Sequence, residues 1–146
     1  MLEDASYVSR QRWSGYVEEM SRAGIAVYPG GDRVAPIEER IATLFSLPEP
    51  PTALVCMSSQ VAIVVMGVLK RRGLEVPRDV SLVGFDDTAY SELMTPSITV
   101  LDVPFVEIGS RAAAMLLERL ERPDMPPRRA TLQAELIKRE SSRKLQ

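Results

Sequence analysis

The chain has 146 residues, and 45% of them are hydrophobic, which is enough to build one packed core. Its 18 basic and 20 acidic residues leave a net charge of −2, which excludes an overall positive field that would recruit nucleic acid. The sequence has no histidine, one cysteine and no apolar signal or membrane segment, so we expect a soluble cytoplasmic chain without a zinc cluster or a disulfide framework.

The first part of the chain predicts two helices with a short strand between them. Apolar residues from Trp13 to Ala23 recur at the spacing of a helix that buries one side, and Gly24 follows as its stop. Residues 25–28 are typical of a short strand. Residues 36–47 then predict a second one-sided helix, which begins at a proline suited to a first helical turn.

A buried strand and an apolar helix follow. The continuous apolar run of residues 52–57 predicts the strand, Ser58 is a plausible N-cap, and residues 59–73 predict the helix. That helix is apolar on nearly every side from Val61 to Leu69, so we expect part of it to contact a partner. The alternative is a helix enclosed within its own lobe.

The second half of the chain continues the alternation. Residues 76–85 and 98–103 predict buried strands, residues 106–122 a long amphipathic helix, and residues 131–140 a last strand. Strands that are apolar throughout and alternate with such helices imply an α/β fold. We expect a largely parallel sheet with helices on both faces.

Polar residues follow two of the predicted strands, at the carboxyl ends where ligands bind in such sheets. They are Ser58 with Ser59, and Asp86 with Asp87. Two adjacent carboxylates fit a grip on hydroxyl groups, a cap for a short helix over residues 88–93, acid chemistry, or a metal. Without further patterned oxygen ligands they fall short of a calcium or magnesium loop, so we predict neither a metal site nor a cofactor.

Four stretches, in this order, carry a resemblance to a known family: "PTALVCMSSQVA", "GLEVPRDVSLVGFDD", "TPSITVLDVPFVEIGSRAAAMLLERL" and "ELIKRESS". Together they resemble the effector-binding core of the lactose-repressor (LacI/GalR) family of bacterial transcriptional regulators, and the match runs from about Arg10 to Ser142. The resemblance implies a periplasmic-binding-protein-like fold of type I, with a doubly wound, mostly parallel sheet. It also implies two lobes hinged around a small-molecule cleft, preceded by a helix-turn-helix that binds operator DNA.

The resemblance further implies that the chain is a partial effector-binding domain. Residues 1–95 and 130–142 correspond to the C-terminal lobe, residues 96–125 to a crossover segment of the N-terminal lobe, and residues 143–146 to a tail. No DNA-binding headpiece is expected in this chain.

The resemblance assigns roles to two of the polar residues, Asp86 and Arg12. Asp86 corresponds to the first aspartate of the family's "G[FY]DD", which accepts hydrogen bonds from ligand hydroxyls; the alternative is a helix cap, the role expected mainly of Asp87. Arg12 corresponds to an arginine that donates to vicinal hydroxyls or to a carboxylate. Its alternative role is an exposed helix arginine in an ion pair.

Three further positions depart from the family pattern. Ser58 and Ser59 stand where the family has the asparagine and the aspartate of "[AV]ND", which weakens a typical grip on a sugar. Arg33 stands where relatives often carry an aromatic residue, and it fits a plain loop residue equally. If Arg33 faces the cleft beside Arg12, two arginines and two serines favour a ligand with a carboxylate or phosphate.

These observations favour a non-enzymatic sensor with no catalytic residues. Its predicted partners are a small sugar-like or anionic effector, a second copy of the chain, and operator DNA through a headpiece outside the chain. One rival is a solute-binding receptor of a transporter. The other is an α/β enzyme that uses Asp86 and Asp87 as acid and base, which the lack of histidine, of a P-loop and of a G-x-S-x-G turn disfavours.

The resemblance also predicts how the chain assembles. Family members have a strand before the helix that starts near Arg10, and the nine residues "MLEDASYVS" are too polar to replace it. We therefore expect no compact monomer. Two copies are expected to bury residues 59–69 and to exchange residues 98–122.

Overall fold

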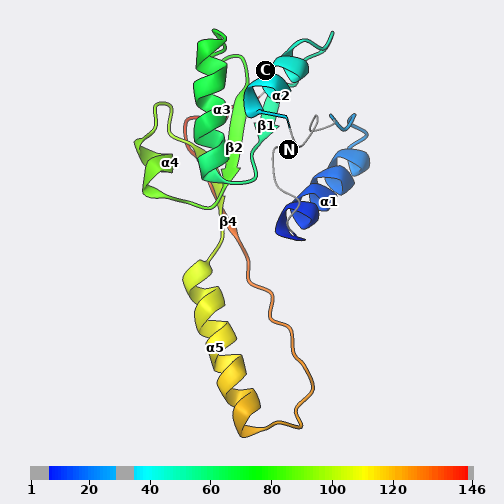
Figure 1. The fold of residues 1–146 in the computed structure, drawn as a ribbon, viewed down its shortest axis with the longest axis vertical. Helices are drawn as coiled ribbons and strands as arrows, with labels where there is room; N and C mark the ends of the chain where they lie inside the picture. Colours follow the sequence, from blue (N-terminus) through cyan, green and yellow to red (C-terminus); the bar gives the residue numbers. More distant parts are fainter. Residues whose placement is uncertain (1–6, 29–34, 145–146) are drawn as a thin grey trace.

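The computed structural model describes residues 7–28 and 35–144. Its elements, labelled in Figure 1, are α1 (Tyr7–Arg22), α2 (Ile37–Phe45), β1 (Ala53–Val55), α3 (Ser59–Arg71), β2 (Ser81–Phe85), α4 (Ala89–Leu93), β3 (Thr99–Asp102), α5 (Phe105–Glu121) and β4 (Glu135–Ile137). The predicted α/β organisation is confirmed, and the observed strands are shorter than the apolar runs that predicted them.

The four strands form one sheet in the order β1-β2-β3-β4. The first three are parallel, with Leu54 beside Leu82 and Val83 beside Thr99, whereas β4 runs antiparallel to β3. The predicted, largely parallel sheet is therefore confirmed. In the described part of the chain β1 forms one edge and is paired with β2 alone.

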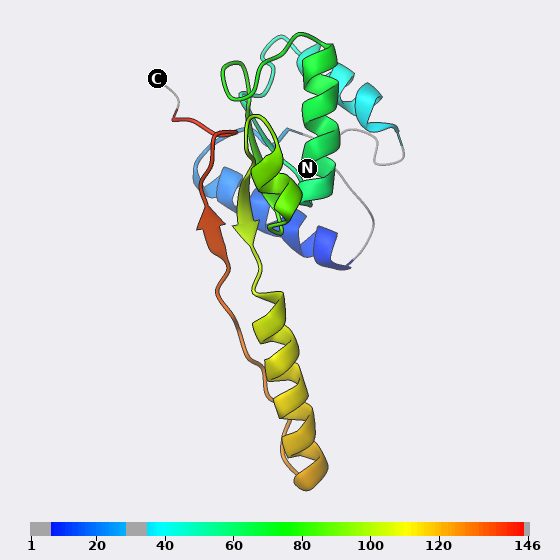
Figure 2. The ribbon, with the colours of Figure 1, turned by 90° about the vertical axis from the view of Figure 1, so that its left-hand side faces the viewer.

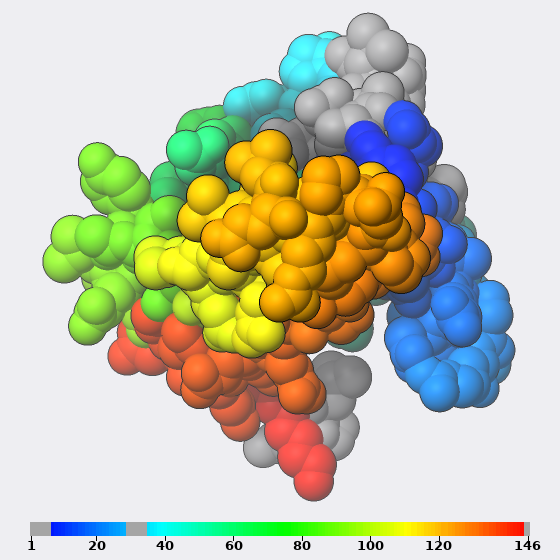
Figure 3. Space-filling view, turned by 90° about the horizontal axis from the view of Figure 1, so that it is seen from below, coloured from blue at the N-terminus to red at the C-terminus, as the bar shows by residue number. Residues whose placement is uncertain are grey.

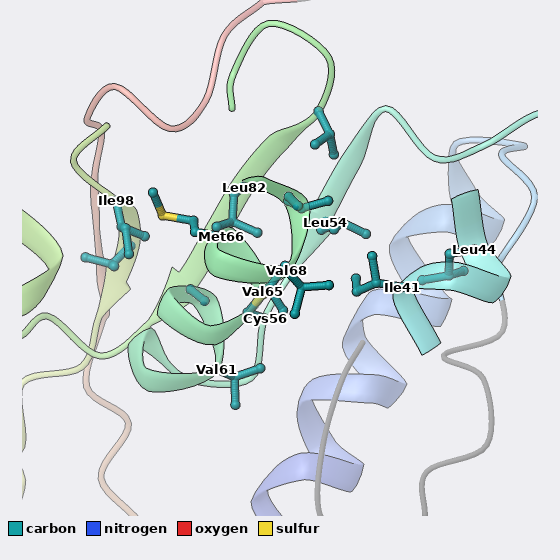
Figure 4. Packing of buried hydrophobic residues seen from close by; sticks show 14 residues of the cluster. Ile41, Leu44, Leu54, Cys56, Val61, Val65, Met66, Val68, Leu82 and Ile98 are labelled. Atoms are coloured by element: carbon teal, nitrogen blue, oxygen red, sulfur yellow. The ribbon is translucent and has the colours of Figure 1, made fainter. Parts of the chain in front are cut away.

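Helix α3 covers one face of this sheet and makes the core with it. Alternate residues of a strand point to opposite faces, and on β2 it is Leu82 and Gly84 that are buried beneath α3. Figure 4 shows apolar side chains of α3 gathered with those of the strands and of α2. On the other face Val83 and Phe85 stay half-buried, so helices do not fully cover both faces in the part that the structure describes.

Most apolar residues of α3 pack within their own chain, among them Val61, Val65 and Leu69. The partner contact expected for part of residues 59–69 therefore concerns the remaining side of the helix, because α2, β2 and α4 already surround much of it. Its open side lines a groove of about 480 Å³. The residues around that groove are Ile63, Met66, Gly67, Lys70, Leu74, Glu75, Val76, Met94, Thr95 and Pro96.

The strand predicted over residues 25–28 is wrong. The amide of Ile25 donates to the carbonyl of Met20 at 2.9 Å, and Gly24 has the left-handed φ of 67° that ends many helices. The backbone of this stretch therefore begins by closing α1, and Ile25 remains 54% exposed. Tyr28, at the end of this stretch, contacts the loop after α2: its hydroxyl donates to the carbonyl of Glu49 at 2.8 Å.

Helix α5 and the segment that returns to β4 project away from the sheet as a hairpin (Figures 1 and 2). No residue of α5 is buried, and Phe105, Leu116, Leu117 and Leu120 are each more than half exposed. The view along the hairpin places α5 beside the returning segment (Figure 3), and the two share a groove between Ile108 and Leu132. The helix thus presents an apolar surface that the described residues leave uncovered.

The segment after β4 returns to the sheet and is held there by buried polar contacts. Ser141 is fully buried; its hydroxyl donates to the carbonyl of Leu82 at 2.6 Å and accepts from the amide of Thr99 at 2.8 Å. Two residues earlier, Arg139 donates through both terminal nitrogens to the carboxylate oxygens of Asp87, at 2.9 and 2.8 Å. These contacts hold residues 139–141 against β2 and β3.

The ion pair corrects the role expected of Asp87. The N-cap of α4 is Thr88, whose hydroxyl and that of Ser91 form a capping box, so Asp87 is not the cap. The hydrogen bonds from Arg139 hold the pKa of the Asp87 carboxyl below its ordinary value, against the opposing effect of burial. Asp87 is thus a structural anion, charged throughout the neutral range.

We predict that Asp87→Asn lowers the free energy of unfolding by roughly 1–3 kcal/mol at pH 7, because Arg139 loses a charged partner in a half-buried place. A carboxyl whose folded pKa is lowered contributes stability above its unfolded pKa, about 4, and loses it as the pH falls through the folded pKa. Urea unfolding should therefore show a gap between the two proteins at pH 7 that closes below about pH 4.

The matched control is Asp124→Asn, since Asp124 is an exposed aspartate at the far end of the hairpin. It should unfold like the unsubstituted chain at both pH values. A gap for Asp87→Asn that persists unchanged in acid would contradict the ion-pair explanation.

Candidate functional site

The candidate site lies at the edge of the sheet where β1 and β2 end. Because the two strands are parallel and in register, their carboxyl ends meet at the same edge. Met57 and Ser58 follow β1 there, and Asp86 follows β2 directly. Gly84 lets α3 approach closely: a Cβ at this position would lie 3.4 Å from the Cα of Ser59.

Arg12, from α1, joins the two strand ends. One terminal nitrogen donates to the carbonyl of Met57, the other lies 3.4 Å from Oδ1 of Asp86, and the guanidinium lies 4.1 Å from the ring centroid of Phe85. The stacking places it on the face of the sheet opposite α3. Its side chain is 19% exposed, so it is not the exposed surface arginine that was the alternative.

Asp86 has an unusual backbone at this edge. Its φ of 68° is left-handed, a conformation that aspartate tolerates better than most residues, and its amide donates to the carbonyl of Leu101 at 3.0 Å. The turn directs the carboxylate towards Arg12, at 25% exposure, whereas the cap of α4 is Thr88. The capping alternative for Asp86 is therefore wrong.

The two serines are placed differently from each other. Ser58 is the N-cap of α3, as predicted: its side-chain oxygen accepts from the amide of Val61 at 3.3 Å, and its hydroxyl hydrogen can still donate. Ser59 is buried, with its oxygen 3.4 Å from that of Thr88. The structure thus brings Arg12, Ser58 and Asp86 to one edge and directs Ser59 into the interior.

The remaining predicted residue, Arg33, lies outside the residues that the structure describes. Within the described ranges, no group of three or more histidine, cysteine, aspartate or glutamate side chains is placed to hold a metal ion. The described helices also include none with the length and apolar character needed to cross a membrane.

Two participants at this edge escaped the sequence analysis. The carbonyl of Met57 is a backbone group, for which no residue pattern exists. Arg139 lies 52 residues after its partner Asp87, in a stretch with several charged residues and no distinguishing motif. Behind the site, Oδ1 of Asp102 accepts from the amide of Asp87 at 3.2 Å.

Comparisons with known proteins show which family the chain is similar to. The family model of the periplasmic binding protein-like domain matches residues 2–142. The transcriptional repressor CytR of Escherichia coli is 34% identical over 139 residues, which cover 92% of this chain and 41% of the repressor. The chain therefore spans about two fifths of the length of this curated relative.

Solved structures give the same assignment. A sugar-binding transcriptional regulator of the LacI family from Escherichia coli, complexed with phosphate, superposes with a TM-score of 0.79 at 29% identity, covering 94% of this chain and 51% of that one. The lac repressor dimer bound to operator and an anti-inducer gives a TM-score of 0.78 at 27% identity, covering 94% and 49%. Relatives of this kind are transcriptional regulators and not enzymes, which removes the acid–base reading of Asp86 and Asp87. The chain belongs to the LacI family of transcriptional regulators, within whose periplasmic-binding-protein-like effector domain its residues fall.

Proposed function

We propose that this chain is the ligand-sensing part of a cytoplasmic LacI-type regulator and that its effector binds at the edge formed by Arg12, Ser58 and Asp86. The observation that carries the proposal is the meeting of Arg12 and Asp86 beyond the ends of two parallel strands. A guanidinium beside a carboxylate offers donors and acceptors together, which suits a ligand with several hydroxyl groups.

The charges around the edge favour a neutral effector over an anionic one. Arg12 is paired with Asp86, and Arg139 is paired with Asp87. Asp102 accepts from the amide of Asp87, and Glu92 also attracts Arg139, so among the described residues here the acidic groups outnumber the basic ones. An anion would have to compete with Asp86 for Arg12, whereas a sugar-like ligand can hydrogen-bond to both.

The effector would act by shifting a balance between conformations. A ligand held between this edge and a second lobe favours the closed arrangement by its differential affinity for it. Closure would change how an attached helix-turn-helix is presented to operator DNA. Because the chain covers 41% of CytR and about half of the solved regulators, the second lobe and the DNA-binding part belong to this proposal and not to the described residues.

We also propose that a second copy of the chain covers the open side of α3. The groove there is lined largely by apolar side chains, and Val64 on the same helix is 46% exposed. The lac repressor that superposes on this chain is a dimer. The exchange of residues 98–122 between copies stays a prediction, which the exposed apolar residues of α5 support.

For the site, we predict that Asp86→Ala weakens binding of a neutral sugar by roughly 1–3 kcal/mol, because a charged acceptor is lost. Calorimetry on the regulator that carries both lobes, with D-ribose, cellobiose and inorganic phosphate as probes, measures this. Asp124→Ala, at the far end of the hairpin, is the matched control and should bind like the unsubstituted protein. Unchanged sugar affinity in Asp86→Ala, or binding of phosphate alone, would contradict the proposed site.

For assembly, we predict that light scattering at micromolar concentration shows a mass above that of one chain and that Gly67→Glu lowers it. Gly67 lies in the groove, where a Cβ would make an ordinary 3.6 Å contact with the end of the Arg71 side chain, so the substitution adds a charge to the proposed interface. The control is Gly15→Glu on α1, where a Cβ meets nothing within 4 Å. A monomeric mass for the unsubstituted chain would refute the proposal.

A further inference from the structure

Asp86 is positioned by its backbone more than by its own side-chain contacts. Within the described part of the chain its carboxylate pairs with Arg12 at 3.4 Å, a long contact for a charged pair. Its left-handed φ of 68° has to be maintained by neighbouring residues, since a non-glycine residue gains nothing from that conformation by itself. What holds residues 86 and 87 therefore decides where the Asp86 carboxylate points.

Asp87 is the residue that is firmly held. Both of its carboxylate oxygens accept from Arg139, at 2.9 and 2.8 Å, and its amide donates to Asp102 at 3.2 Å. The two side chains of the ion pair are 16% and 24% exposed, so water competes weakly for them. Asp87 is thus held through both its side-chain carboxylate and its main-chain amide.

Arg139 is itself fixed to the sheet by contacts that do not involve Asp87. Its terminal nitrogen Nη1 also donates to the carbonyl of Ile98 at 3.0 Å. Its amide donates to Oγ1 of Thr99 at 2.9 Å, and that hydroxyl donates to the Arg139 carbonyl at 3.1 Å. These hydrogen bonds hold Arg139, which follows β4, in a fixed position beside β3.

We infer that Arg139 is a positioning residue of the effector site: through Asp87 it fixes the left-handed turn that presents the Asp86 carboxylate to Arg12. The ligand-binding role of Asp86 in this inference rests on the proposed function, whereas the positioning itself does not. Two parallel hydrogen bonds from one planar group resist rotation of the Asp87 side chain. A lysine at position 139 would keep the charge and lose that restraint.

The first test needs no ligand. In the chain labelled with nitrogen-15, hydrogen exchange of the Asp86 amide and the side-chain Nε signal of Arg12 report the turn and the Arg12 contact. We expect Arg139→Lys to speed exchange of the Asp86 amide about tenfold and to shift the Arg12 signal towards that of Asp86→Ala. A purely stabilising role of Arg139 would leave the Arg12 signal in place.

The matched control is Arg143→Lys. Arg143 lies in the same terminal segment and donates to the carbonyls of Pro77 and Arg78, away from the site. If Arg139→Lys does not fold, Asp87→Asn disrupts the same ion pair from the other side and should give the same two changes. Wild-type exchange at Asp86 together with a wild-type Arg12 signal, in whichever variant folds, would overturn the inference.

The second test uses ligand in the two-lobed regulator. Fluorescence of Trp13, the one tryptophan of the chain and the residue that follows Arg12 in the sequence, reports titration with D-ribose or cellobiose. Arg139→Lys should weaken binding about tenfold when Asp86 is present and much less in an Asp86→Ala background, because it acts through that residue. Equal losses in both backgrounds would overturn the inference. If the unsubstituted regulator binds neither sugar, the proposed effector class fails and the ligand-free test alone decides the role of Arg139.

Discussion

The close packing of α3 on β2 sets the geometry of the whole carboxyl edge. At Gly84 the helix lies within van der Waals reach of the strand, since a Cβ there would already contact Ser59 and Ala62 at 3.4 and 3.5 Å. With α3 this near, its cap at Ser58 lies at the same level as the end of β2. Arg12 then reaches the edge from the opposite face over Phe85, so the site is assembled from both sides of one thin sheet.

The parts of the fold that the sequence predicted are those set by local patterns. The helix after Ser58 and the turn after Phe85 follow from periodicity and from the end of an apolar run, and both were found within a few residues. The strand over residues 25–28 failed because the apolar residues of a helix terminus resemble a short strand, and backbone pairing at Ile25 closes α1 instead.

The partners of the site residues were less predictable for a different reason. The sequence contains 18 basic residues, any of which is a possible ion-pair partner for Asp87. Arg139 becomes that partner because the segment returning from the hairpin crosses β3. Likewise, an apolar helix does not reveal whether its own lobe or another chain covers each side. In the structure α2 packs more extensively against α3 than α4 does. One side of α3 is therefore packed, and the other lines an open groove.

The hairpin that carries α5 leaves and re-enters the sheet between neighbouring strands. Its two ends meet at Asp102 and Glu135, which are opposed residues of an antiparallel pair (Figure 2). A tight turn of a few residues could close that gap without altering the register of β3 and β4. The remainder would keep its core and its carboxyl edge, which makes the hairpin a removable module and the sheet with its helices a candidate for a minimal, independently folding scaffold.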